Sequence, residues 1–163
     1  PHSENLSVSN ITGKNTFEFF YASHSNKISL KNLNVYDIIY NLSAIGIGTN
    51  ESQNIEMRNI SVNNIIGQDY VTRGIRINYC SGTLDMTDIH ISNITAESTM
   101  RGLDVTFFGD VNINRLRIDH CYSPGFQSYD RSIVMQIAFP EDHQLSLINI
   151  LRCRRYTLCR SRW

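Results

Sequence analysis

Pairs of carboxylates are the first feature of this sequence that could do chemistry, because hydrolysis of a glycosidic bond uses two of them, about 5 to 10 Å apart. Glu56 and Asp85 hold matching positions in two similar segments and form one such pair. We interpret the pair as a solvated acidic surface; a weak calcium site is the alternative, although Ca²⁺ takes six or more oxygen ligands. Arg76 and Asp104, matched in the same way, are expected to form a surface ion pair. We therefore assign no catalytic residue and do not expect an enzyme.

The histidines and cysteines lack the spacings of metal or nucleophilic sites. The five histidines include no His-Glu-x-x-His, and we interpret them, His90 and His120 included, as surface or corner residues. The four cysteines form no Cys-x-x-Cys pair. Cys121 replaces an aliphatic residue of the repeat and is expected to be buried, whereas Cys153 and Cys159 are a candidate disulfide. Neither a metal nor a cofactor is expected.

Six Asn-x-Ser/Thr sequons point to a compartment rather than to a reaction. Chance in a chain so rich in Asn, Ser and Thr would give about half as many, so the excess favours a secreted or cell-surface glycoprotein. Asn41 and Asn50 flank or lie in expected loops and are the best acceptors. The other four acceptors fall at expected corners of the fold, where an amide ladder and a glycan would compete, and they are Asn5, Asn10, Asn59 and Asn93.

A repeat positions all of these residues. Similar segments begin at Leu6, Leu33, Ile60, Ile89 and Leu116, spaced 27, 27, 29 and 27 residues apart by subtraction. A second family of short alternating segments begins at Ile28, Ile55, Leu84, Val111 and Leu145, and a third begins at Phe17, Ile45, Ile75, Leu103 and Ile133. Strict alternation of apolar and polar residues indicates strands with one buried face. Because strands this short bury little alone, stacking of successive repeats is needed, and the sequence predicts an all-β, parallel β-helix.

Polar residues at fixed positions in the repeat support this prediction. One column holds Asn5, Asn32, Asn59, Asp88, Arg115 and Asn149, and another holds Asn10, Asp37, Asn64, Asn93 and His120. Stacked Asn and Asp side chains can hydrogen-bond from one coil to the next, and Asn tolerates the left-handed backbone conformation of a corner. We therefore expect Asn/Asp ladders along the corners.

Over about residues 5 to 150 the chain resembles the right-handed parallel β-helix proteins of the pectin-lyase-like superfamily. The resemblance implies a right-handed helix, here of about five to six coils with three short strands each. Family hydrolases similar to polygalacturonases carry Asn-Thr-Asp, Asp-Asp, Gly-His-Gly and Arg-Ile-Lys motifs, and none of the four occurs in this sequence. Members range from polysaccharide-cleaving enzymes to non-catalytic surface proteins, so the fold alone does not choose a function.

The last dozen residues differ from the repeat. Five of the 15 basic residues lie there, which leaves the rest of the chain with 10 basic against 15 acidic residues. An acidic body argues against a nucleic-acid partner. If a sixth copy begins at Ile150, Arg152 falls at a buried position, where an unpaired charge is prohibitive. We therefore expect a repeat domain over residues 1–151 and a separate Arg/Cys-rich cap, interface or non-native tail over residues 152–163.

Together these observations predict a non-catalytic structural module of an extracellular glycoprotein that contributes to a fibre, matrix or adhesive assembly. Its partners would be neighbouring copies or flanking domains, contacted through coil ends and sheets. No apolar run is long enough to span a bilayer. The alternative is a β-helix protein that binds or cleaves polysaccharide, for which the candidate carbohydrate-contact aromatics are Phe20, Phe108, Tyr122, Phe126 and Tyr129.

Overall fold

The computed structural model describes residues 5–14, 18–67, 71–121, 132–138, 145–153 and 159–162, and the described residues are strands, turns and bends without a helix. They form an all-β parallel solenoid of about 4 turns, fewer than the five to six coils expected. The strands are β1 (Leu6–Gly13), β2 (Glu18–Ser23), β3 (Ile28–Tyr40), β4 (Ile45–Asn50), β5 (Gln53–Gly67), β6 (Val71–Ala96), β7 (Thr99–Asp119), β8 (Ser132–Ala138), β9 (Leu145–Cys153) and β10 (Cys159–Arg162).

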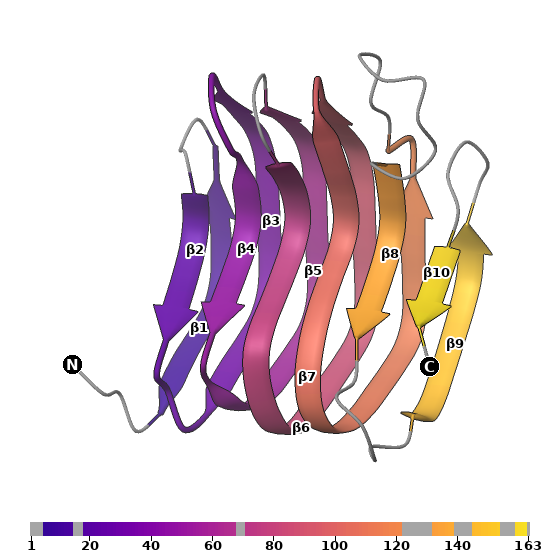
Figure 1. The fold of residues 1–163 in the computed structure, drawn as a ribbon. Helices are drawn as coiled ribbons and strands as arrows, with labels where there is room; N and C mark the ends of the chain where they lie inside the picture. Colours follow the sequence, from indigo (N-terminus) through magenta and orange to yellow (C-terminus); the bar gives the residue numbers. More distant parts are fainter. Residues whose placement is uncertain are drawn as a thin grey trace.

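Two layers of parallel strands enclose the core (Figure 1). The rear layer stacks β1, β3, β5 and the second halves of β6 and β7, followed by β9; the front layer stacks β2, β4, the first halves of β6 and β7, then β8 and β10. The chain rises at the rear and descends at the front while it advances from the N-terminal end, which makes the coil right-handed. In β6 and β7 the strand runs through the lower bend without a break, so short expected strands merge into long ones.

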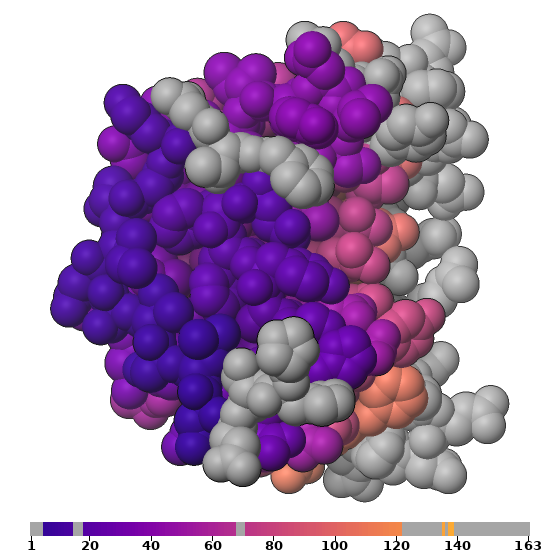
Figure 2. Space-filling view, turned by 90° about the vertical axis from the view of Figure 1, so that its left-hand side faces the viewer, coloured from indigo at the N-terminus to yellow at the C-terminus, as the bar shows by residue number. Residues whose placement is uncertain are grey.

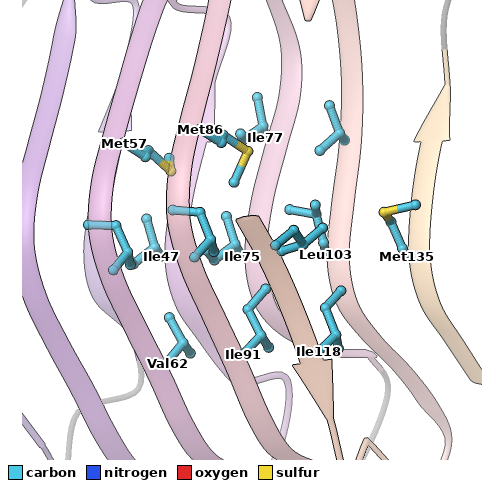
Figure 3. Close-up of a cluster of buried hydrophobic side chains, with 14 of the residues drawn as sticks. Ile47, Met57, Val62, Ile75, Ile77, Met86, Ile91, Leu103, Ile118 and Met135 are labelled. Carbon is cyan, nitrogen blue, oxygen red and sulfur yellow. The ribbon is translucent and has the colours of Figure 1, made fainter. Parts of the chain in front are cut away.

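The space between the layers is filled by columns of apolar side chains at equivalent positions. Leu33, Ile60, Ile89 and Leu116 lie in register on successive coils and are almost fully buried. Figure 3 shows Ile47, Ile75 and Leu103 of the front layer in one row, facing the row of Val62, Ile91 and Ile118 from the rear layer. Burying one such side chain contributes about 1.5 to 3 kcal/mol, so the filled columns explain why the coils stack.

The corners of the coil are residues in the left-handed backbone region. In the two expected columns, φ lies between 50° and 57° for Asn10, Asn32, Asp37, Asn59, Asn64, Asp88, Asn93, Arg115 and His120. Asn and Asp adopt this region at lower cost than other residues with a Cβ, because their short side chains hydrogen-bond locally. The corner residues therefore turn the chain while the strands on either side keep their pairing.

The first coil has a different register from the one the repeat predicts. We expected Leu6 to lie over Leu33, but β1 pairs with the start of β3, so that Leu6 lies over Ile28 and Ile11 over Leu33. The reason is a second repeat inside the coil, because Ile28–Leu33 and Leu33–Ile38 both read apolar, polar, apolar, polar, Asn or Asp, apolar. Either segment fits over β1. The observed pairing moves Asn10 out of the column of Asp37 and into the column of Asn32.

Two other registers differ from the prediction. In the front layer, Ile75 lies over Leu103 as expected, but Ile75 pairs on its other side with Ile47 rather than Ile45, and Leu103 pairs with Met135 rather than Ile133. Phe17, the expected first member, lies outside the described residues. At the other end, β9 continues across the expected boundary at residue 151. A register shift between Leu116 and Arg117 pairs Arg152 with Arg117 and Cys153 with Ile118, so Arg152 does not take the register position of Ile118.

Candidate functional site

Ladders of side-chain hydrogen bonds follow the two expected corners. Along the first, Asn59 Nδ2 donates to Asn32 Oδ1 at 2.9 Å, and Asn32 Nδ2 donates to Asn10 Oδ1 at 2.9 Å. Further along the same column, Arg115 forms two hydrogen bonds to the Asp88 carboxylate, with Nη2 2.6 Å from Oδ2. This hydrogen bonding holds the pKa of Asp88 below its ordinary value. An Arg in a left-handed corner is thus explained by the carboxylate one coil before it.

The second corner is less regular. Asn64 Nδ2 donates to Asp37 Oδ1 at 2.6 Å, but Asn93 donates to Asn63 Oδ1 at 2.8 Å rather than to Asn64. Ser92 Oγ donates to the same Asn63 oxygen at 3.2 Å. The ladder therefore shifts by one residue between β5 and β6. In both corners, side-chain hydrogen bonds join one coil to the next, so these corner residues have a structural role.

A third corner column, which the sequence analysis missed, runs along the lower bend. His24, Glu51 and Tyr79 have φ of 56°, 48° and 51°, although Glu and Tyr are unusual in this region. His24 Nε2 lies 2.8 Å from Glu51 Oε2. The next residue in each case turns inward, and Ser52 Oγ donates to the Asn50 carbonyl at 2.9 Å while Cys80 Sγ donates to the Asn78 carbonyl at 3.3 Å.

A sequence pattern for this third corner exists but is weak. Ser23-His24-Ser25, Asn50-Glu51-Ser52 and Asn78-Tyr79-Cys80 each place a small polar or thiol residue after the corner residue. The buried backbone amide of Ser25 donates to Oγ of Ser52, which lies 27 residues later in the sequence. The backbone amide of Ser52 likewise donates to Sγ of Cys80, 28 residues later. Burial is also the main reason why the pKa of the Cys80 thiol is raised. The corner residues share no side-chain type, so position alone identifies them.

The acidic pair lies where the repeat places it. Glu56 and Asp85 are in register on β5 and β6. Glu56, however, lies 3.2 Å from Lys31 Nζ and 2.6 Å from Arg58 Nε, and Asp85 Oδ1 accepts a hydrogen bond from Asn112 Nδ2 at 3.3 Å. Although desolvation opposes it, hydrogen bonds and these cations hold the pKa of Glu56 below its ordinary value. The carboxylates are therefore used in a surface network with cations and an amide.

The expected ion pair of Asp104 with Arg76 does not form. Instead, Asp104 Oδ2 accepts from Arg73 Nε at 2.7 Å and from Arg101 Nη1 at 2.8 Å. Asp104 is buried and the Arg73 side chain is only 15% exposed. Arg73 reaches Asp104 from β6, and Arg101 reaches it from three residues earlier on β7, whereas the charge of Arg76 acts on Glu18. The Arg73–Asp104 pair thus links the coil of β6 to that of β7 in a buried position, in place of the surface pair that we expected.

Glu18 sits at the N-terminal edge of the front layer. Its carboxylate and the ring of Tyr21 cover Gly48, since a Cβ added there would lie 2.8 Å from Glu18 Oε1 and 2.8 Å from Tyr21 Cδ2. Oε1 is buried and has no hydrogen-bond partner in the described structure. Burial raises the pKa of Glu18, and the charge of Arg76 opposes this shift. Burial therefore makes the ionised form of Glu18 unfavourable. Among the described residues, no second carboxylate faces it.

His90 and Asp119 form a second local cluster. Asp119 is buried, and its Oδ2 lies 3.4 Å from His90 Nε2 and accepts a hydrogen bond from Arg117 Nε. Burial raises the pKa of Asp119, but Arg117 and His90 outweigh it and the net pKa is lowered. The second carboxylate oxygen, Oδ1, lacks a partner among the described residues. His90 thus lies beside a buried carboxylate, and His120 is an exposed corner residue.

Two of the five candidate carbohydrate-contact aromatics, Phe20 on β2 and Phe108 on β7, lie within the described residues. Phe20 is partly buried against the core, and Phe108 is 37% exposed. Tyr122, Phe126 and Tyr129 lie outside the described residues. Phe108 instead stacks on Tyr79, which the sequence analysis did not select, with ring centroids 6.4 Å apart and an interplanar angle of 29°. Tyr79 is 59% exposed, so the two rings form an accessible aromatic surface at the lower bend.

The sequon asparagines differ in how firmly the fold engages them. Asn41 is exposed at a bend between β3 and β4. Asn50 accepts from Asn78 Nδ2 at 2.8 Å and donates to Glu51 at 2.9 Å. Asn5 is exposed, and the remaining three acceptors, Asn10, Asn59 and Asn93, belong to the corner ladders. Modification of Asn41 would therefore disturb the fold less than modification of Asn10, Asn50, Asn59 or Asn93, which neighbouring side chains engage.

The remaining candidates concern cysteines, metals and membranes. Cys80 and Cys121 are buried, as expected for Cys121. The side chains of Cys153 and Cys159, the candidate disulfide, lie outside the described part of the structure. Within the described residues, no three His, Cys, Asp or Glu side chains gather as metal ligands, and no helix is present that could cross a bilayer. The chain matches no family model, and the comparisons with curated proteins and with solved structures found no match.

Proposed function

We propose that this chain is a non-catalytic structural module of a secreted or cell-surface glycoprotein, in which a rigid solenoid spaces neighbouring parts of a fibre, matrix or adhesive assembly. The supporting observation is the continuous stacking of β3, β5, β6 and β7, with filled apolar columns inside and side-chain ladders along the corners. Such stacking makes each coil depend on its neighbours and resists bending. The buried carboxylates of the described residues serve the fold, since Asp104 pairs with Arg73 of the preceding coil and Asp119 with Arg117 of its own strand.

Expression of the chain through a eukaryotic secretory pathway tests the compartment. We expect added glycan mass on Asn41, removed in the Asn41→Gln variant, because this exposed asparagine lies at a bend outside the ladders. Asn59→Gln is the matched comparison, and it should leave the glycan mass unchanged because Asn59 is engaged by Asn32. Secretion with the bare polypeptide mass would contradict the glycoprotein proposal.

A reaction assay tests the non-catalytic part. The full chain is incubated with a panel of neutral and uronic-acid polysaccharides, and new reducing ends and unsaturated products are measured. We expect no release above a heat-denatured control. Turnover of any polymer that is reduced by Glu18→Gln or by Asp119→Asn would overturn the structural proposal in favour of a polysaccharide-cleaving enzyme.

A second candidate function, carbohydrate binding, has one specific observation in its favour, the exposed stack of Tyr79 and Phe108. Flat aromatic faces are common at recognition surfaces, because they bury large areas at a low cost in side-chain entropy. Asn50, Asn78 and Glu51 lie along the same bend and offer hydrogen-bonding groups. Affinity electrophoresis on immobilised polysaccharides, with Tyr79→Ser compared with Tyr21→Ser, distinguishes this candidate: retardation lost only in Tyr79→Ser supports it.

A further inference from the structure

The N-terminal coil, formed by β1 and β2, ends in open strand edges. Within the described structure β1 pairs only with β3, and β2 pairs only with β4. Figure 2 looks onto this end, where the indigo side chains of the first coil form the face of the molecule. An open strand edge presents backbone N–H and C=O groups that can pair with a further strand.

Within the described residues, the apolar columns of the core also reach this end, and their last members there are less buried than those inside the solenoid. Ile11 lies in the column of Leu33 and Ile60, yet it is 43% exposed whereas each of those residues is 1% exposed. Leu6 and Val8 are only partly buried, although their partners Ile28 and Leu30 are 0% exposed. The column positions that are sealed inside the solenoid are therefore open on the first coil.

The side-chain hydrogen bonds of the corner ladders point toward the N-terminal end of the solenoid. Between the described residues, each hydrogen bond that an Asn side-chain amide donates to another coil goes from the later coil to the earlier one. At three of these bonds the direction does not depend on how amide oxygen and nitrogen are assigned, because the acceptors are the Asn26 carbonyl and the Asp37 and Asp85 carboxylates. Asn10 uses Oδ1 to accept from Asn32, and its Nδ2 makes no hydrogen bond with the described residues.

We propose that the N-terminal coil is a binding surface for a further parallel β-coil that carries Asn or Asp at its left-handed corner. Such a coil would extend the backbone pairing at β1, cover Ile11 and its neighbours, and offer an oxygen acceptor to Asn10 Nδ2. We assign this partner because its interface with β1 would repeat the interface between β1 and β3, in register, in burial and in hydrogen-bond direction. It rests on the proposed structural function and names the chemistry of the partner.

Binding of a synthetic peptide to the full chain tests the proposal. The probe is a fluorescent peptide with the sequence of residues 27–38, because this segment contains the alternating apolar residues and Asn32 and is kept soluble by its charges. The chain is made without glycans, since a glycan on Asn10 would cover the edge. We expect saturable binding by fluorescence anisotropy, weakened at least tenfold, about 1.4 kcal/mol, by Ile11→Lys in the chain or by Asn32→Leu in the peptide.

Two further variants keep the test decisive. Asn10→Asp retains the acceptor for Asn32 and a residue suited to the corner but removes the donor, so it should also weaken binding. Ile39→Lys adds the same charge at a side chain that is 56% exposed on β3, and it should bind the peptide as the unmodified chain does. Absence of binding, or equal affinities of Ile11→Lys and Ile39→Lys, would overturn the proposal.

Sedimentation of the unmodified chain distinguishes another occupant. Concentration-dependent association that Ile11→Lys abolishes would assign the edge to a second copy and overturn the assignment to a separate coil. Failure of peptide binding would leave the structural function standing, whereas polymer turnover would remove that function without affecting the binding result. The two proposals therefore fail in different experiments.

Discussion

Single residues in the left-handed region turn this chain from one strand direction to the next. Asn, Asp, His, Glu, Tyr and Arg all occupy such corners, although only Asn and Asp adopt the conformation readily. The residues with less suitable side chains are supported by their neighbours, Arg115 by Asp88 and His24 by Glu51. Two properties therefore determine which side chain suits a corner. One is its own preference for the left-handed backbone conformation, and the other is the polar partner that the preceding or following coil provides.

Replacement of Asn59 separates these two contributions. Asn59→Ala should lower the free energy of unfolding by about 1 to 3 kcal/mol, since it loses the hydrogen bond to Asn32 and places a less suitable residue at φ 52°. Asn59→Gly loses only the hydrogen bond and should lose less than Asn59→Ala. Urea unfolding measures both values. If Gly is as destabilising as Ala, the backbone conformation does not contribute.

Glu18 should make stability depend on pH in an identifiable direction. Its folded pKa is raised, so the folded state binds the proton more readily than the unfolded chain, and ionised Glu18 destabilises the fold. Glu18→Gln should therefore increase the free energy of unfolding at pH 7, by less than about 1 kcal/mol because the carboxylate remains partly solvated. The gain should vanish as the pH falls below the unfolded value of about 4.3.

Glu56→Gln is the control with the opposite sign, because the folded pKa of Glu56 is lowered by hydrogen bonds and nearby cations. That variant should lose stability at pH 7, and its difference from the unmodified chain should shrink as the pH falls through the folded pKa. Thermal unfolding between pH 3 and pH 7 measures both variants. The same sign for both would contradict the assignment.

At the scale of the strand, glycine determines how closely the two layers approach. Gly46 and Gly74 lie opposite the rear-layer residues Val62 and Ile91, and a Cβ on Gly74 would come within 2.7 Å of both Ile91 Cγ2 and the Gly102 carbonyl oxygen. The backbone of the next coil cannot yield in the way that a flexible side chain can. These glycines therefore mark places where the front-layer backbone is in close contact both with the backbone of the next front-layer strand and with a rear-layer side chain.

Gly74→Ala should destabilise the protein by about 1 to 3 kcal/mol through overpacking of β6 against β7. Gly48→Ala is the matched substitution, because its added methyl group meets only the ends of the Glu18 and Tyr21 side chains, which can move aside. It should cost less than Gly74→Ala in the same urea titration. Equal costs would mean that the layers separate easily at this position.

The whole molecule is a one-dimensional stack, because each coil makes its main contacts with the coils before and after it. The central coils, in β5, β6 and β7, have a neighbour on both sides, whereas β1 and β2 have one described neighbour. Stability should therefore be highest in the middle and fall toward the N-terminal end.

Hydrogen exchange followed by mass spectrometry tests this gradient. Ile89→Ala, at a residue that is 1% exposed, should cost about 2 to 5 kcal/mol and increase exchange in β5 and β7 as well as in β6. Val8→Ala should increase exchange only within β1, β2 and the start of β3. Uniform exchange across the chain in both variants would indicate a single cooperative unit instead of a stack.

The sequence by itself determined the strands, the repeat length and the parallel stacking, because alternation and spacing are local properties of the chain. It also indicated Asn32, Asn59 and Asp88 as corner residues, since the left-handed region limits which side chains fit. Only the tertiary structure decided the register of β1, because two segments of each coil carry the same pattern and both satisfy it. The partners of Asp104 and the corner at Tyr79 were likewise decided by which side chains neighbouring coils bring together, and the sequence does not encode those distances separately.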